Sequence, residues 1–217
     1  MSSVNTFFTI QYAQPPDYHF SHDSVFLARR VFEITLAKRL IPSSVLDLCA
    51  GCGVVGLDFL FHLSKEKLEL PKTIDFLEVQ NIYNSYFQEN VATLRCPAPK
   101  NFLNYNYADI IGAPDFFEKY DLILCNPPYF RVEQGLLSPS NFKNRCRFFI
   151  DSDLKNLISC ISHCLANTGS AYVLIKSMHD HGIDLDEELT LILQHLPMQF
   201  KKIGLIRSTD LYEFNKI

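Results

Sequence analysis

Residues 47–56, with the sequence DLCAGCGVVG, decide the class of fold. They join a short apolar strand, Val45–Leu48, to the helix that follows. Glycines placed directly after a strand let the backbone turn sharply and approach a ligand closely. Gly51, Gly53 and Gly56 also match G-x-G-x-x-G, the pattern of dinucleotide-binding proteins. Taken alone, the loop is either a nucleotide-binding turn or an ordinary strand-to-helix connection.

Short β-rich runs alternate with helical stretches on both sides of this loop, which is typical of an α/β fold with a parallel sheet. Helices are expected at residues 24–40, 54–63, 81–94, 154–165 and 185–196, and strands at 45–48, 73–78, 102–107, 121–125, 170–176, 200–206 and 211–217. The last two strands are so closely spaced that we expect an antiparallel hairpin. Residues 131–147 show no apolar periodicity and are expected to form a loop.

Length and composition suit one globular domain, because the chain has 217 residues, 47% of them hydrophobic and 20% charged. We expect residues 1–41 to form an N-terminal cap segment and helix, and residues 42–217 a Rossmann-like core. The formal charge of −4 argues against a protein that coats nucleic acid by bulk electrostatics. Met1–Thr6 lacks the pattern of a signal peptide, and no apolar run approaches the ~18 residues that span a bilayer. A cytoplasmic location without membrane association is therefore expected.

The seven cysteines are scattered through expected strands and helices, which is typical of reduced thiols in a reducing compartment. Cys49 and Cys52 form one C-x-x-C pair. A structural zinc site needs roughly four ligands, and the sequence offers no second pair. The histidines have no metal-ligand spacing with a convincing partner. No metal site is therefore expected.

Acidic residues near the ends of three strands narrow the choice of ligand. Asp47 lies in the first strand, where a carboxylate could hold the ammonium group of S-adenosylmethionine (SAM), directly or through water, but would repel the phosphates of a dinucleotide. Glu78 ends the second strand, where an acidic side chain can accept both ribose hydroxyls of either ligand. Asp109 follows the third strand and could accept a hydrogen bond from adenine, or could equally well form a turn. Asp47 therefore favours SAM over NAD.

The tetrapeptide Asn126-Pro127-Pro128-Tyr129 leaves the carboxyl end of the fourth expected strand, where open α/β sheets bind ligands. Consecutive prolines fix the backbone and remove two N–H donors, so the loop presents carbonyl oxygens. The Asn126 side-chain oxygen and the Pro127 carbonyl can hold both hydrogens of a planar NH₂ group, with bonds that strengthen as the nitrogen pyramidalises. Tyr129 can stack on the planar group and align it for in-line attack. These four are the candidate catalytic residues.

The two motifs together resemble those of class I N-methyltransferases that carry the [D/N/S]-P-P-[Y/F] motif. Within that group, YHFSHDSVFLA at residues 18–28, DLILCNPPYF at residues 121–130 and the basic loop that follows are most similar to bacterial tRNA adenine-N6 methyltransferases, which modify the purine beside the anticodon of valine tRNA. The resemblance covers nearly the whole chain. It implies a Rossmann-like, seven-stranded, mostly parallel sheet with helices on both faces and a C-terminal antiparallel hairpin. SAM would be the methyl donor and S-adenosyl-L-homocysteine (SAH) the product.

The resemblance also implies a set of cofactor-binding residues, namely His22, Asp23, Asp47, Cys49, Gly51, Gly53, Glu78, Val79, Asp109 and Asn126. Cys49 departs from the family pattern, which has a glycine at this position. We expect the replacement to be tolerated if the φ angle at Cys49 is negative, a region that is open to any residue.

The motif chemistry does not separate adenine from glutamine, because both present a planar NH₂ group. The loop at residues 131–147 places four basic residues after the tetrapeptide, namely Arg131, Lys143, Arg145 and Arg147. Such charges could hold phosphates while a base is flipped into the pocket, and Phe130 could stack on an unpaired base. A tRNA or other RNA substrate is therefore expected, with a solvated loop as the alternative.

Protein-(glutamine-N5) methyltransferases of release factors are the first alternative. Most carry a helical N-terminal domain of several dozen residues, whereas about 20 residues precede the first helix here, although a shorter type exists. An rRNA or DNA base N-methyltransferase and an NAD-dependent oxidoreductase are more distant alternatives, and the oxidoreductase would have no use for the tetrapeptide. A SAM-binding subunit without activity is a further alternative, against which the intact Asn126 and Tyr129 argue.

Overall fold

The computed structural model describes residues 8–177, 182 and 184–217. These residues form a seven-stranded sheet in the order β3-β2-β1-β4-β5-β7-β6. The strands are β1 (Ser44–Leu48), β2 (Thr73–Leu77), β3 (Lys100–Leu103), β4 (Tyr120–Cys125), β5 (Leu165–Ile175), β6 (Met198–Ile206) and β7 (Thr209–Lys216). The first five strands pair in parallel, and β7 lies antiparallel between β5 and β6. The predicted fold class, including the C-terminal hairpin, is confirmed.

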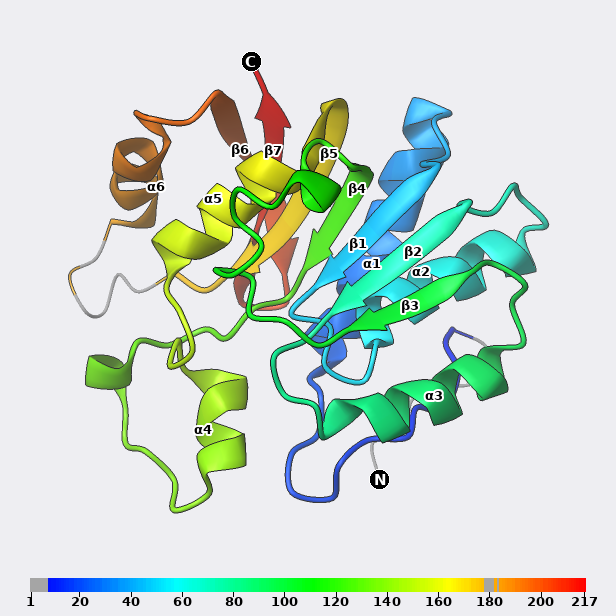
Figure 1. Cartoon of the computed structure of the whole chain (residues 1–217), viewed down its shortest axis with the longest axis horizontal. Coiled ribbons are helices and arrows are strands. Elements are labelled where there is room, and N and C mark those ends of the chain that lie inside the picture. Colours follow the sequence, from blue (N-terminus) through cyan, green and yellow to red (C-terminus); the bar gives the residue numbers. More distant parts are fainter. Residues whose placement is uncertain (1–7, 178–181, 183) are drawn as a thin grey trace.

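Helices cover both faces of the sheet (Figure 1). They are α1 (His22–Lys38), α2 (Val54–Lys65), α3 (Tyr83–Leu94), α4 (Asn141–Arg147), α5 (Leu154–Cys164) and α6 (Leu185–Leu193), with short 3₁₀ turns η1 (Pro114–Phe116) and η2 (Val132–Gln134). The first three pack on one face, and α5 and α6 on the other, whereas α4 lies apart at the bottom of the view (Figure 1). No helix in the described part of the chain is long and apolar enough to cross a membrane.

The strand β4 shows why the sheet needs a helix layer on each side. Leu122 and Leu124 belong to the core beneath α1, α2 and α3, while Ile123 and Cys125 belong to the core beneath α5. Successive side chains of a strand point to opposite faces, so a strand that is apolar throughout must be covered twice. The amphipathic stripe predicted for α5 provides one cover, and its residue Leu157 is fully buried.

The prediction of a loop at residues 131–147 was wrong in part, because η2 and α4 lie within it. Ser140 caps α4, and its Oγ accepts a hydrogen bond from the Lys143 N–H at 3.4 Å. The buried Asn144 side chain accepts from the Ser138 N–H at 2.7 Å and donates to the Ser138 carbonyl at 2.8 Å. A helix of seven residues is held here by a cap and a buried amide. Neither signal produces apolar periodicity.

The strand order reverses at β1, whose neighbours are β2 and β4. Leu48 lies in register with Leu77 on one side and with Cys125 on the other, so all three strands end at one level. The residues that follow therefore emerge side by side. This is the topological switch point at which open α/β sheets bind ligands.

Candidate active site

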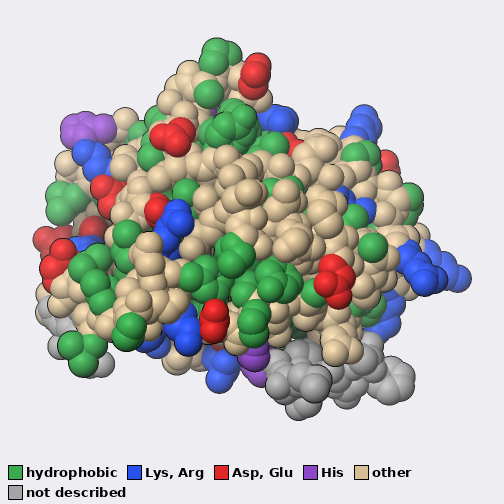
Figure 2. All heavy atoms as spheres, turned by 60° about the horizontal axis from the view of Figure 1, so that its bottom comes forward, with side chains coloured by type: hydrophobic (Ala, Val, Ile, Leu, Met, Phe, Trp, Pro, Cys, Tyr) green, Lys and Arg blue, Asp and Glu red, His purple; other side chains and the backbone are tan. Residues whose placement is uncertain are grey.

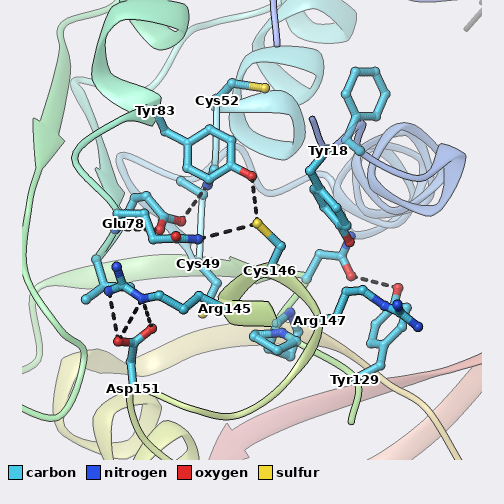
Figure 3. A pocket seen from close by; sticks show the side chains of 18 of the residues that line it. Tyr18, Cys49, Cys52, Glu78, Tyr83, Tyr129, Arg145, Cys146, Arg147 and Asp151 are labelled. Atoms are coloured by element: carbon cyan, nitrogen blue, oxygen red, sulfur yellow. Dashed lines mark hydrogen bonds and ion pairs between the residues drawn. The ribbon is translucent and has the colours of Figure 1, made fainter. Parts of the chain in front are cut away.

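A cavity of about 200 Å³ opens where β1, β2 and β4 end. Its walls come from the glycine loop (residues 49–53), the β2–α3 connection, the tetrapeptide, the end of α4 and the segment before α1 (Figure 3). It brings together many of the residues predicted from sequence, namely Cys49, Gly51, Glu78, Val79, Asn126, Pro127, Pro128, Tyr129, Phe130, Arg145 and Arg147. Motifs that lie far apart in the sequence thus share one pocket.

The glycine loop turns through left-handed backbone conformations. Gly51 has φ +55° and Gly53 has φ +84°, and a Cβ at Gly53 would lie 2.8 Å from the Phe87 ring. Cys49 has φ +62°, so the condition under which a cysteine would be tolerated here without strain, a negative φ, is not met. A non-glycine residue pays roughly 1–2 kcal/mol for this conformation. The loop is therefore strained at a residue of the pocket wall.

Asp47 lies behind the loop and is fully buried. Its Oδ2 accepts a hydrogen bond from the Gly56 N–H at 2.8 Å, so it caps α2, whose N-cap residue Gly53 has no side chain to do so. Its Oδ1 has no hydrogen-bond partner among the described residues. Burial raises the pKa of the Asp47 carboxyl well above its usual range. The structure gives Asp47 a role in shaping the loop, and it is absent from the pocket wall.

Glu78 is a buried acid in the pocket wall. Its Oε2 accepts from the Gly51 N–H at 2.9 Å and its Oε1 from the Gln80 N–H at 2.8 Å, which fixes the carboxylate between the two loops. Burial raises the pKa of Glu78, and the two backbone hydrogen bonds oppose that effect. Each oxygen keeps lone pairs beyond these bonds, so the group can accept further hydrogen bonds.

The tetrapeptide is linked to the start of α1. The Asn126 Nδ2 donates to the Ser24 Oγ at 2.8 Å, and the Tyr129 hydroxyl donates to the Asn126 Oδ1 at 2.8 Å. The same hydroxyl lies 3.3 Å from the Asp23 Oδ2. Pro127 is buried, and the two proline rings restrict the backbone and remove the N–H groups at residues 127 and 128. The N-terminal helix thus positions the candidate catalytic amide.

The last turn of α4 lines the pocket, which the sequence did not indicate. The Cys146 thiol lies 3.2 Å from the Tyr83 hydroxyl and accepts from the Gln80 Nε2 at 3.4 Å (Figure 3). Arg145 forms an ion pair with Asp151, at 2.8 Å between its terminal nitrogen and Oδ1. These five residues all line the pocket, but only Arg145 was predicted. No local motif marks the others, since they meet only in the folded chain.

Other residues predicted from sequence lie outside the pocket wall, namely His22, Asp23, Asp47, Gly53, Asp109, Arg131 and Lys143. Asp109 is exposed, and its N–H donates to the Asn106 carbonyl at 3.0 Å, which matches the turn role considered for it. His22 is exposed at the start of α1. Asp23 is buried and reaches the pocket through Tyr129.

Charge around the pocket is more balanced than the run of basic residues suggests. Arg131 forms an ion pair with Glu188, as Arg145 does with Asp151. Arg147 is exposed, and its guanidinium lies 5.8 Å from the centre of the Phe130 ring. Acidic, basic and apolar side chains are interspersed on the face that Figure 2 shows. Within the described residues, Lys143 and Arg147 form no ion pair with an acidic side chain.

The described residues contain no group of three or more His, Cys, Asp or Glu side chains arranged to hold a metal ion. Cys49 and Cys52 are both free thiols. Burial raises the pKa of the Cys52 thiol to about 12, which suits a packing role.

No family model matches the chain. Among curated proteins, it is 30% identical over 145 residues to the tRNA1(Val) (adenine(37)-N6)-methyltransferase of Christiangramia forsetii, covering 62% of this chain and 52% of that protein. It is 28% identical over 131 residues to the protein of the same description from Escherichia coli O157:H7, covering 60% of this chain and 49% of that protein. The matches thus span about half the length of these relatives.

Solved structures define the class of fold. The ribosomal protein L11 methylase of Lactobacillus delbrueckii subsp. bulgaricus aligns with a TM-score of 0.60 at 16% identity, covering 94% of this chain and 83% of that chain. A candidate methyltransferase of Streptococcus mutans, solved in complex with SAH, aligns with a TM-score of 0.53 at 14% identity, covering 81% of this chain and 89% of that chain. The chain therefore has the class I methyltransferase fold. The resemblance to class I methyltransferases is supported by both kinds of comparison.

Proposed function

We propose that this protein is a SAM-dependent methyltransferase that methylates a planar exocyclic nitrogen, namely adenine N6 in a tRNA. One observation carries the proposal. The tetrapeptide Asn126-Pro127-Pro128-Tyr129 faces the same pocket as Glu78 and the glycine loop. A group that accepts hydrogen bonds from a planar NH₂ thus adjoins a group suited to a ribose, at the switch point of the sheet.

The pocket residues fit SAM. The Glu78 oxygens have lone pairs left for the ribose hydroxyls, and Gly51 lets the backbone come close because it has no Cβ. The buried Asp47 Oδ1 has no hydrogen-bond partner in the described part of the chain, which suits an ordered water between this oxygen and the ammonium group. SAM supplies an electrophilic methyl group when it is bound. The sheet order, with β7 antiparallel, differs from the 3-2-1-4-5-6 order of the dinucleotide fold and so disfavours NAD.

The tetrapeptide would hold the acceptor nitrogen. Pro127 and Pro128 offer carbonyl oxygens on a fixed backbone, and the Asn126 amide adds a side-chain oxygen. Hydrogen bonds from both amine hydrogens to these oxygens strengthen as charge develops on the nitrogen. The Tyr129 ring would stack on the planar group and set its distance from the cofactor. The nitrogen would carry a positive charge after methyl transfer and would then lose its proton to solvent water, so these residues need not act as a general base.

The choice of adenine in tRNA rests on the curated relatives, whose names give that substrate, and on the exposed Arg147 beside Phe130 at the pocket. A guanidinium beside an aromatic ring suits a phosphate next to a stacked base. A release-factor glutamine is the alternative acceptor. We also propose that residues 42–217 form the catalytic core, with residues 1–41 as its cap.

The test is transfer of radiolabelled methyl groups from SAM to tRNA, rRNA and release factor in parallel, followed by nucleoside and amino-acid analysis. We expect N6-methyladenosine in tRNA. Label on glutamine would support methylation of a planar nitrogen but show that the substrate is a release factor and not a tRNA. No label in any acceptor would refute the proposal. Asn126→Ala should lose turnover by about 100-fold while SAM affinity, measured by calorimetry, stays within a few-fold.

A further inference from the structure

The acceptor oxygen that the proposed reaction needs is already in use. The Asn126 Oδ1 accepts a hydrogen bond from the Tyr129 hydroxyl at 2.8 Å. The Asn126 amide cannot easily turn away, because its Nδ2 donates to the Ser24 Oγ at 2.8 Å. A substrate amine that binds this oxygen must therefore compete with the phenol of the same tetrapeptide.

The phenol has one hydrogen and two acceptors within reach. Its oxygen lies 2.8 Å from the Asn126 Oδ1 and 3.3 Å from the Asp23 Oδ2. Burial and the nearby Asp23 carboxylate raise the pKa of Tyr129, so the hydroxyl keeps its hydrogen. The Thr209 side chain also hydrogen-bonds to the phenol, and because this bond lowers the pKa of Tyr129, Thr209 acts as a donor to the phenol oxygen. The Tyr129 hydroxyl can thus donate its hydrogen to Asn126 or to Asp23, but it cannot form a full hydrogen bond to both at once.

We infer that Asp23 is a positioning residue that takes over the hydrogen bond of the Tyr129 hydroxyl when the substrate amine binds Asn126. The inference rests on the proposed function. Without Asp23, the incoming amine would leave the hydrogen of the half-buried Tyr129 hydroxyl without an acceptor, and an unsatisfied donor is costly. A carboxylate is a stronger acceptor than an amide, so it can compensate for the longer distance after a small rotation of the phenol.

Asp23 lies where it can play this role. It is 7% exposed and absent from the pocket wall. Its second oxygen, Oδ1, lies 3.4 Å from a guanidinium nitrogen of Arg207, in the turn between β6 and β7. One oxygen thus faces Arg207 while the other faces Tyr129. The ion pair with Arg207 thus engages one carboxylate oxygen and leaves the other for Tyr129, which is one of the pocket residues labelled in Figure 3.

The test is a double-mutant cycle on methyl transfer at saturating SAM, with the variants Asp23→Asn, Tyr129→Phe and the two combined. Asp23→Asn should lower kcat by about tenfold or more, because the hydroxyl stays on Asn126. In the Tyr129→Phe background no hydroxyl competes, so adding Asp23→Asn should change kcat by less than about twofold. A structural role for Asp23 would not show this suppression.

Arg207→Gln is the matched control, because it breaks the ion pair but leaves the carboxylate. It should change kcat less than Asp23→Asn does. An equal loss from both variants, or an Asp23→Asn loss that persists in the Tyr129→Phe background, would overturn the inference. If Asp23→Asn does not fold, Asp23→Ser takes its place in the cycle. A wild-type protein that methylates none of the three acceptors refutes the proposed function and this inference with it, whereas an active wild type without suppression refutes the inference alone.

Discussion

The backbone at Cys49 offers the most direct test of how this pocket is built. Its φ of +62° is a conformation in which glycine costs little and other residues are strained. We compare Cys49→Gly with Cys49→Ala. Both variants remove the thiol and its hydrogen bond to Cys125, so that loss cancels between them. The remaining difference is mainly the cost of placing a Cβ on a left-handed backbone.

The magnitude follows from two opposing effects. A Cβ at this φ costs roughly 1–2 kcal/mol in the folded state. Glycine gives back about 0.4–1 kcal/mol, because its unfolded chain has more conformational freedom to lose. Cys49→Gly should therefore be more stable than Cys49→Ala by roughly 0.8 kcal/mol, which is the difference between the midpoints of the two ranges. For a protein of this size, that free energy corresponds to a difference of roughly 1–4 °C in Tm.

The assay is equilibrium unfolding in urea, with the midpoints compared at an unchanged slope. Gly112→Ala is the matched control, because Gly112 also has a left-handed φ, +83°, and a Cβ there would meet nothing within 4 Å. Gly112→Ala should lower the free energy of unfolding by a similar amount relative to the wild type. The strain at Cys49 would be refuted if Cys49→Ala were at least as stable as Cys49→Gly while Gly112→Ala were destabilised.

Three further outcomes are expected. Gly56→Ala would place a Cβ 2.6 Å from the fully buried Phe76 ring, so it should lower the free energy of unfolding by about 1–3 kcal/mol, and an unchanged urea midpoint would contradict this. Burial raises the folded-state pKa of Asp47 above its unfolded value, so its contribution to stability is greatest in acid and is lost as the pH rises through the folded pKa. The non-titrating Asp47→Asn should therefore gain stability relative to the wild type as the pH rises from about 4, and two parallel stability profiles would disprove it. Lys143→Glu combined with Arg147→Glu should weaken tRNA binding and flatten its salt dependence, and an unaltered salt slope would remove α4 from the RNA site.

Local sequence signals predicted the fold well, because they depend on near neighbours. Alternating apolar strands and amphipathic helices require a covered parallel sheet, and the short spacing between the strands expected at 200–206 and 211–217 favours a hairpin. The glycines of the first loop and the prolines at Pro127 and Pro128 restrict the backbone wherever they occur. These signals also placed Glu78 and Asn126 correctly at one edge of the sheet.

Tertiary structure decided which way individual side chains face. Asp47 caps α2 from behind the loop, and Arg131 forms an ion pair with Glu188, which lies 57 residues further along the sequence. The contact of Cys146 with Tyr83 exists only because the end of α4 packs against the pocket wall. Such contacts join residues that are remote in sequence, and a single chain carries no local pattern for them.

The sequence by itself thus determined the class I fold and the position of its switch point, since backbone freedom and apolar periodicity are local properties. Only the tertiary structure decided that the backbone of Cys49 is left-handed and that Asp23 lies within hydrogen-bonding distance of the Tyr129 hydroxyl. It also decided that Arg131 and Arg145, after the tetrapeptide, form ion pairs with acidic residues. Dihedral strain, hydrogen-bond competition and ion pairing depend on distances of a few ångström, which are set when the whole chain packs.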